Sequence, residues 1–291
     1  MCSRKSRYPG IIFVSLHLLW GCAGEPASNV SDVLAGPFLN QPFPGDTAVI
    51  FAPGLVSLEG RYEYGLSFSP EGKELLFTAQ MPEGPSRLVH FSAQDSGWVG
   101  PRDVTLSGGI KGEEMEAFFT PDGQKVHFAA YDEGLDVRIW TVDRIENEWS
   151  SPRKLGSPVS DGPGFFPTAT AEGTVYYSNL TERRTYRVEV SGDSVVSAED
   201  AGFDGMHAFI SPDESFVLVD ARAGGEGAKA DIFVAFRQEN GEWTDLVDLG
   251  PGVNTEYSET CPSLSPDGRF IFFSRYNEAN DVSNIYWVSA R

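Results

Sequence analysis

Short hydrophobic runs alternate with polar turns along most of the chain, and one such arrangement occurs five times. Each copy has a β-type run, a turn rich in proline, acidic residues and glycine, and a second, mostly apolar run. The copies are LSFSPEGKELLFTAQ from residue 66, AFFTPDGQKVHFAAY from 117, PTATAEGTVYYSNL from 167, AFISPDESFVLVDAR from 208 and PSLSPDGRFIFFSRY from 262. Their starts lie 51, 50, 41 and 54 residues apart. A period of about fifty residues with strand-like content predicts propeller blades or another β-rich array, so the expected fold class is all-β.

The turn within each copy is predicted to be a structural hairpin. Proline presets φ for the second turn position, aspartate bonds back to the local backbone, and glycine supplies the positive φ that closes the turn. The turn aspartates Asp122, Asp213 and Asp267 are therefore expected to shape the backbone and not to carry chemistry.

Two further strands follow each hairpin in register. The third strand is expected at 87–91, 137–142, 186–190, 232–236 and 284–288. The fourth begins near Trp98, Trp149 and Trp243, and Val195-Val196 replaces the tryptophan in the third copy. The fifth copy ends at Arg291, one strand short.

The strand missing from the last copy is predicted at the other end of the chain. Residues 47–60, TAVIFAPGLVSLEG, precede the first hairpin as the tryptophan strands precede the others. An N-terminal strand that completes the last blade removes two open sheet edges, which would otherwise invite aggregation. The prediction is thus a β-propeller of five four-stranded blades over residues 47–291, with six blades as the alternative.

The repeats resemble the TolB-like, WD40-like β-propeller repeat. Its pattern, Glu-x-x-Pro-x-x-Ser-Pro-Asp-Gly before an aromatic-ended strand, is matched in full from Glu259 to Gly268. The resemblance covers about residues 47–291 and implies a propeller that works in assembly of the cell envelope. TolB itself has six blades and an extra α/β domain, and neither a sixth copy nor that domain is visible in this sequence.

The N-terminal segment reads as an export signal. Basic residues at 4, 5 and 7 precede an apolar run over 11–20, which is too short to span a bilayer as a helix. The run ends in Leu19-Trp20-Gly21-Cys22, which resembles a bacterial lipobox with Cys22 as the lipidated residue. We therefore expect a signal peptide over 1–21, a tether over 22–46, and an outer-membrane lipoprotein facing the periplasm or the cell surface.

Acidic residues outnumber basic ones 42 to 22, a formal charge of −20, and removal of 1–21 would leave −23. Such a surface repels nucleic acid and anionic lipid head groups, so neither is an expected partner, and the membrane is expected to be reached through the lipid alone. Loss of Cys2 and lipidation of Cys22 would leave Cys261 unpaired, so no disulfide framework is expected. We interpret Cys261 as a small buried hydrophobe and expect a monomer.

Binding residues are expected at the channel face where the first strand of each blade begins. Seven residues before each turn proline, or before Ala171 in the third copy, stand Glu63, Glu114, Gly164, Gly205 and Glu259, which we call the glutamate column. The candidate channel-face residues are Arg61, Glu63, Glu114, Glu116, Tyr131, His207, Arg222, Glu259, Arg275 and Tyr276. They would suit a cation, an amine or a basic peptide. Alternatively, the column belongs to the repeat and bonds a neighbouring backbone or an arginine such as Arg275.

Common enzyme signatures are missing from the sequence. It contains no Gly-x-Ser-x-Gly elbow and no His-Glu-x-x-His motif, and the acidic loop at 131–137 does not follow a calcium-loop pattern. We therefore predict no catalytic residue, metal or cofactor, and a non-catalytic propeller that binds an envelope protein or a small ligand. The alternative is a hydrolase or lyase acting on a carbohydrate or a related substrate, with channel-face carboxylates such as Glu114 and Glu259 as the acid and base.

Overall fold

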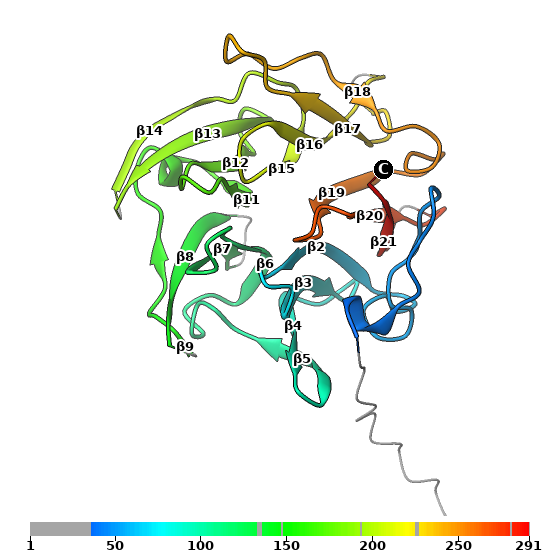
Figure 1. Cartoon of the computed structure of the whole chain (residues 1–291). Helices are drawn as coiled ribbons and strands as arrows, with labels where there is room; N and C mark the ends of the chain where they lie inside the picture. Colours follow the sequence, from blue (N-terminus) through cyan, green and yellow to red (C-terminus); the bar gives the residue numbers. More distant parts are fainter. Residues whose placement is uncertain are drawn as a thin grey trace, which may run out of the picture. The chain divides into compact units, whose positions relative to one another are not determined.

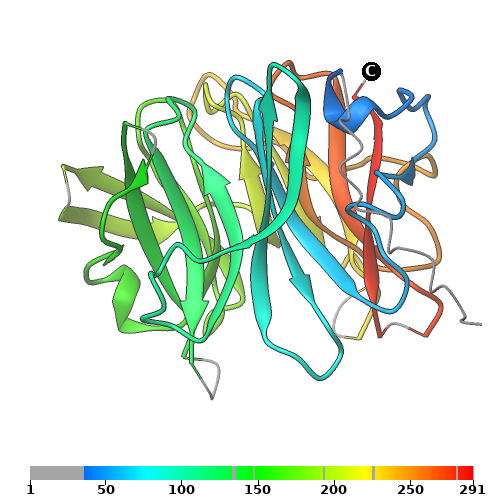
Figure 2. The same ribbon diagram turned by 90° about the horizontal axis from the view of Figure 1, so that it is seen from below.

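The computed structural model describes residues 36–291 except 133–135, 147, 193, 225–226, 280 and 291. Five small antiparallel sheets stand in a ring around a common central axis (Figure 1). Seen from the side, the strands run between the two faces of the ring (Figure 2). Neither of the two short helices in the described ranges has the length and apolar character needed to cross a membrane.

The described strands fall into five blades in chain order. Blade 1 contains β2 (Tyr62–Phe68), β3 (Glu74–Gln80), β4 (Ser86–Gln94) and β5 (Gly97–Val104). Blade 2 contains β6 (Glu113–Phe119), β7 (Lys125–Tyr131), β8 (Arg138–Ile145), β9 (Glu148–Trp149) and β10 (Arg153–Lys154). Blade 3 contains β11 (Gly164–Ala169), β12 (Val175–Asn179), β13 (Arg184–Ser191) and β14 (Ser194–Asp200). Blade 4 contains β15 (Met206–Ile210), β16 (Phe216–Ala221), β17 (Asp231–Phe236) and β18 (Val247–Asp248).

Blade 5 is built from both ends of the chain. Its strands β19 (Glu259–Leu264), β20 (Phe270–Tyr276) and β21 (Ser283–Ser289) are completed by β1 (Val49–Ile50). Val49 pairs with Trp287 and Ile50 with Tyr286, and the Phe51 amide donates to the Ile285 carbonyl at 2.8 Å. The predicted closure and the five-blade count are confirmed, whereas the alternative of six blades is wrong.

The outer strands of blades 2 and 4 are shorter than the sequence suggested. In blade 2 the fourth strand is split into β9, which ends at Trp149, and β10, and both pair with β8. In blade 4 Trp243 makes an isolated bridge to Arg237, and β18 begins four residues later. Tryptophan therefore marks the turn into the outer edge of these blades and does not lie in a long outer strand.

Core packing lies between neighbouring blades. Leu76 and Leu88 of blade 1 pack against Phe119 and Phe128 of blade 2, and comparable clusters join the other blades. Since each blade buries both faces against its neighbours, a sheet at an open gap would expose one apolar face, which makes ring closure a condition for stability.

The hairpin turns have the predicted chemistry. The Asp122 carboxylate accepts bonds from the Thr120 hydroxyl at 2.6 Å and from the Gln124 amide at 3.0 Å. Asp267 accepts from Ser265 at 2.6 Å in the same way. Gly123 adopts a φ of +68°, as the turn requires. These aspartates hold their own turns, as expected.

Residues 36–46, the described part of the expected tether, pack against the propeller. They include the short helix η1 (Phe38–Asn40), in which Phe38 and Leu39 are buried. The Phe38 ring contacts Phe68 of blade 1 and Phe270 of blade 5 at 5.4 and 5.3 Å between centroids. This segment therefore covers the joint between the first and last blades. Cys22 and residues 23–35 lie outside the described residues.

Removal of the Phe51 ring is predicted to weaken the closed ring. Phe51 is fully buried, with centroids 5.1 Å from Phe272 and 5.2 Å from Trp287, so Phe51→Ala should cost about 3–5 kcal/mol of unfolding free energy. Ile50→Ala is the matched control, because Ile50 is the neighbouring residue, at the end of β1, but is exposed, and it should cost less than about 1 kcal/mol. Denaturant unfolding of both variants checks this, and equal losses would contradict it.

Candidate functional site

The glutamate column is part of the scaffold. The Glu63 carboxylate accepts bonds from Arg61 Nε at 2.5 Å and from Asn284 Nδ2, in blade 5, at 2.7 Å. Glu114 accepts from the Thr105 hydroxyl at 2.5 Å and from the amides of residues 106 and 107 at 2.7 and 2.9 Å. Both carboxylates are buried and their acceptor positions are used within the fold.

Glu259 follows the same rule in blade 5. It accepts from the Thr255 hydroxyl at 2.6 Å and from Arg275 Nε at 2.8 Å, and Arg275 also donates to the Val253 carbonyl. Burial raises the pKa of the Glu259 carboxyl group, as it does for Glu63. Of the two interpretations left open by the sequence, these contacts favour the structural one for the column.

A second ring of equivalent positions lies two residues further along each first strand. Between β2 and β3, and at the matching place in every blade, the strand register shifts by one residue. This bulge position is occupied by Gly65, Glu116, Phe166, His207 and Cys261, all with φ between +47° and +60°. A bulge of this kind redirects one side chain out of the regular alternation of a strand. Within this ring, Glu116, His207 and Cys261 line the same cavity.

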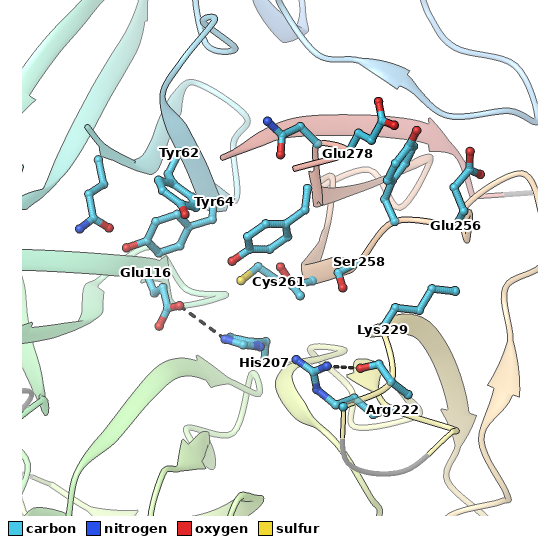
Figure 3. Close-up of a pocket in the computed structure, with 17 residues that line it drawn as sticks. Tyr62, Tyr64, Glu116, His207, Arg222, Lys229, Glu256, Ser258, Cys261 and Glu278 are labelled. Carbon is cyan, nitrogen blue, oxygen red and sulfur yellow. Dashed lines mark hydrogen bonds and ion pairs between the residues drawn. The ribbon is translucent and has the colours of Figure 1, made fainter. Parts of the chain in front are cut away.

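A cavity of about 810 Å³ opens at this face of the propeller (Figure 3). Its wall contains four tyrosines and several charged side chains on the loops that follow β16 and β20 and precede β19. These tyrosines and charged residues are Tyr62, Tyr64, Tyr257, Tyr276, Arg222, Lys229, Glu256 and Glu278. We call this space the channel cavity.

The side chains at the bulge positions interact across blades. His207 Nδ1 donates to the Asp220 carboxylate at 2.7 Å, and its Nε2 lies 3.7 Å from Glu116 Oε1. The donor atoms of Glu116, His207 and Cys261 all lie within 4.8 Å of one another. Figure 3 shows Glu116 joined to the His207 ring by a dashed line, with Cys261 near both.

Burial and charge shift the titration of these groups in opposite directions. Burial raises the pKa of Glu116 to about 7, against the opposing effect of His207. Burial is the largest single effect on His207 and would lower its pKa, but Asp220 and Cys261 together outweigh burial and hold the pKa well above its usual range. Burial also raises the pKa of the Cys261 thiol. The site therefore concentrates two carboxyl groups, an imidazole and a thiol in a space shielded from bulk water.

The structure brings four of the ten predicted channel-face residues to the channel cavity. These are Glu116, His207, Arg222 and Tyr276. The others are held in the scaffold or near it: Arg61, Glu63, Glu114, Glu259 and Arg275 by the contacts above, and Tyr131 by a bond of 3.1 Å between its hydroxyl and that of Ser86. Glu114 and Glu259 do not line the channel cavity, so they do not form an acid and base pair there.

The sequence did not predict that Cys261 and Asp220 would join Glu116 and His207 in one cluster. Cys261 is buried, as predicted, but its sulfur lies within 4.8 Å of donor atoms of Glu116 and His207. The signal was available in the repeat, because Cys261 stands five residues before its turn proline, as Glu116 and His207 do. Asp220 lies inside a second strand, in the apolar run FVLVDAR, where the sequence gives no sign of its partner.

Comparisons with solved structures place the fold among β-propellers of different activities. A protein described as TolB from Agrobacterium tumefaciens has a TM-score of 0.51 at 16% identity, covering 76% of this chain and 71% of its own. An α-L-arabinofuranosidase from Podospora anserina, solved with cellotriose, has a TM-score of 0.53 at 12% identity, with coverage of 84% and 98%. The catalytic domain of an α-L-arabinofuranosidase from Coprinopsis cinerea has a TM-score of 0.52 at 11% identity, with the same coverage.

No protein-family model matches the chain, and no curated protein matches it in sequence. At identities this low, the structural likeness shows a propeller fold and no activity, because one fold carries many unrelated functions. The fold is thus shared with TolB and with propeller enzymes, and function has to be argued from the site.

Loss of a column glutamate is predicted to destabilise the fold. Glu63→Ala leaves the buried Arg61 guanidinium without its carboxylate and removes an acceptor from Asn284, so it should cost about 3–5 kcal/mol. Glu59→Ala is the control, because Glu59 is exposed on the same loop, and it should change stability by about 0.5 kcal/mol or less. Denaturant midpoints measure both effects. A Glu63→Ala protein as stable as wild type would show that Glu63 does not stabilise the fold.

Proposed function

We propose that this protein is a binding module of the bacterial cell envelope that captures a small polar ligand in the channel cavity. The observation that carries this proposal is the cavity itself, whose volume of about 810 Å³ falls within the range of about 300–1,000 Å³ typical of small-molecule sites. A protein partner would instead need a broad complementary surface, of roughly 800 Å² on each side.

The lining of the channel cavity suits a ligand with both apolar faces and polar groups. Tyr62 and Tyr276 meet edge to face at 6.1 Å between centroids and offer flat, amphipathic surfaces. Arg222 and Lys229 provide positive charge from blade 4, and Glu256 and Glu278 provide negative charge from blade 5 (Figure 3). A ligand with hydroxyl, amide or zwitterionic groups would find partners on both sides.

The N-terminal sequence supports placement at the envelope. The basic start, the apolar run over 11–20 and the Gly21-Cys22 pair would deliver the chain as a lipoprotein, with Cys22 carrying the anchor. A formal charge of −20 argues against nucleic acid as the ligand. We keep the outer membrane, facing the periplasm or the cell surface, as the proposed location.

The second candidate function is a hydrolase or lyase acting on a carbohydrate. The observation that favours it is the position of Glu116, a carboxyl group in the channel cavity beside the His207 imidazole, which is an arrangement that can transfer protons. Turnover of any member of a glycan panel by wild type, lost in Glu116→Gln, would establish this candidate over simple binding.

Ligand capture is predicted to depend on the wall of the channel cavity. When the protein is screened against neutral oligosaccharides, amino acids and dipeptides, at least one compound should raise the melting temperature, because binding to the folded state stabilises it. Tyr276→Ala and Arg222→Ala should each weaken its affinity at least tenfold in calorimetric titration, since both side chains line the cavity.

The controls are Tyr186→Ala and Arg237→Ala, because neither residue lines the channel cavity. They should leave the affinity unchanged. If no compound binds while a protein is recovered reproducibly with wild type but not with Arg222→Ala, the small-ligand proposal fails and a protein partner takes its place.

Membrane attachment is predicted to depend on Cys22. Cys22→Ala should move the exported protein from the membrane fraction to the soluble fraction, because the lipid would have no thiol to modify. Fractionation of cells expressing the two forms, with Cys261→Ala as the control that keeps Cys22, measures this. Membrane retention of the Cys22→Ala protein would contradict lipid anchoring at this residue.

A further inference from the structure

We propose that Glu116, His207 and Cys261 bind a zinc ion at the inner end of the channel cavity. The three side chains come from blades 2, 4 and 5, and each occupies the bulge position of its first strand. They supply a carboxylate, an imidazole and a thiolate, which are the three ligand types that proteins use for zinc. This inference goes beyond the proposed ligand binding, which stands or falls independently of the metal.

The backbone that carries each ligand is fixed by a neighbouring blade. The Glu116 amide donates to the Thr78 hydroxyl at 2.7 Å, and the His207 amide to the Ser178 hydroxyl at 2.8 Å. The Cys261 amide donates to the Asp220 carboxylate at 3.3 Å. Three bulges held in this way give a preorganised set of donors, which lowers the ordering cost of binding.

The side chains are also oriented toward a common point. Glu116 Oε2 accepts the Phe166 amide at 2.8 Å, which leaves Oε1 facing His207. The Asp220 carboxylate accepts the His207 Nδ1 proton, so Nε2, which faces Glu116 and Cys261, is the nitrogen that would release its proton and bind the metal. A carboxylate behind a histidine is the common second partner of zinc-bound imidazoles. Gly65, the bulge residue of blade 1, leaves the space that Glu116 occupies, because a Cβ there would lie 3.1 Å from the Glu116 Cα and Cγ.

The spacing of the donors is close to that of a bound zinc ion. Zinc bonds of about 2.0–2.3 Å in a tetrahedron place ligand atoms about 3.3–3.8 Å apart. The distance from His207 Nε2 to Glu116 Oε1 is 3.7 Å, and no pair in the group exceeds 4.8 Å. A contraction of about one ångström, within the range of a side-chain rotation, would complete the site.

The charge and the opening of the site fit a divalent ion with one free position. A thiolate and a carboxylate with a neutral imidazole balance the charge of Zn²⁺ and relieve the burial of two ionisable acids. Three protein ligands leave the fourth position open, as in zinc sites that bind water or a ligand. All three donors line the channel cavity, so that position faces it.

The test is metal binding by the full chain, solubilised in detergent and stripped of metal. Titration with Zn²⁺ against a chromophoric chelator should give one tight site per chain. Co²⁺ in its place should give a thiolate-to-cobalt absorption band. Cys261→Ser and His207→Gln should weaken zinc at least 100-fold, and Asp220→Asn about 10–100-fold, because it removes the partner that orients His207.

His127→Gln is the matched control, since His127 is also buried but bonds Thr141 within blade 2, and it should leave zinc affinity unchanged. Cys261→Ser changes no other cysteine, so loss of the cobalt band in this variant assigns the band to Cys261. Melting curves show whether each variant folds, and Cys261→Ala serves if the serine variant does not. Wild type that binds no zinc, gives no cobalt–thiolate band, or binds zinc as tightly in the Cys261 and His207 variants would overturn the proposal.

Discussion

The pairing of β1 with β21 is the contact on which the rest of the molecule depends. Two residue pairs join β1 to β21, and further hydrogen bonds, among them those from the Phe51 amide to Ile285 and from the Ser289 amide to Gly45, join the two ends of the chain. Such a short strand contributes little by itself, and its strength comes from the aromatic layer that it carries. Phe51 and Phe38 pack against Trp287 and Phe272. Hydrophobic packing therefore stabilises the closure, and the few backbone hydrogen bonds set the register of the two ends.

Closure also determines which chemistry the molecule can assemble. Glu116, His207 and Cys261 come from blades 2, 4 and 5, and they approach one another because the first strands of a closed ring face a common axis. In an open array of sheets, a residue of blade 2 would contact blades 1 and 3 and would not reach blade 5. The cluster is therefore a property of the ring, and the sequence separation of its members is irrelevant to their distance.

Much of the fold could be predicted from the sequence because its determinants are local and repeated. The turns that match or resemble Ser-Pro-Asp-Gly form hairpins by their own backbone preferences, and five copies define the blade count. The closing strand was found because residues 47–60 match the position of a missing element. The short extent of β1 and the division of the fourth strand of blade 2 into β9 and β10 could not be predicted from the sequence. The ends of edge strands depend on packing that a hydrophobic pattern does not encode.

The site was harder to predict, and the reason lies in the difference between two neighbouring columns of the repeat. The glutamate column keeps the same side chain in three of five blades, and each of those carboxylates bonds the scaffold of its own or a neighbouring blade. The bulge position keeps a backbone conformation in all five blades but is occupied by five different residues. Where a repeat fixes the side chain, that side chain builds the blade; where it fixes the backbone alone, the side chain is free to serve the channel. A search for function in this propeller should therefore start from Glu116, His207 and Cys261, where the copies disagree, and not from the glutamates that they share.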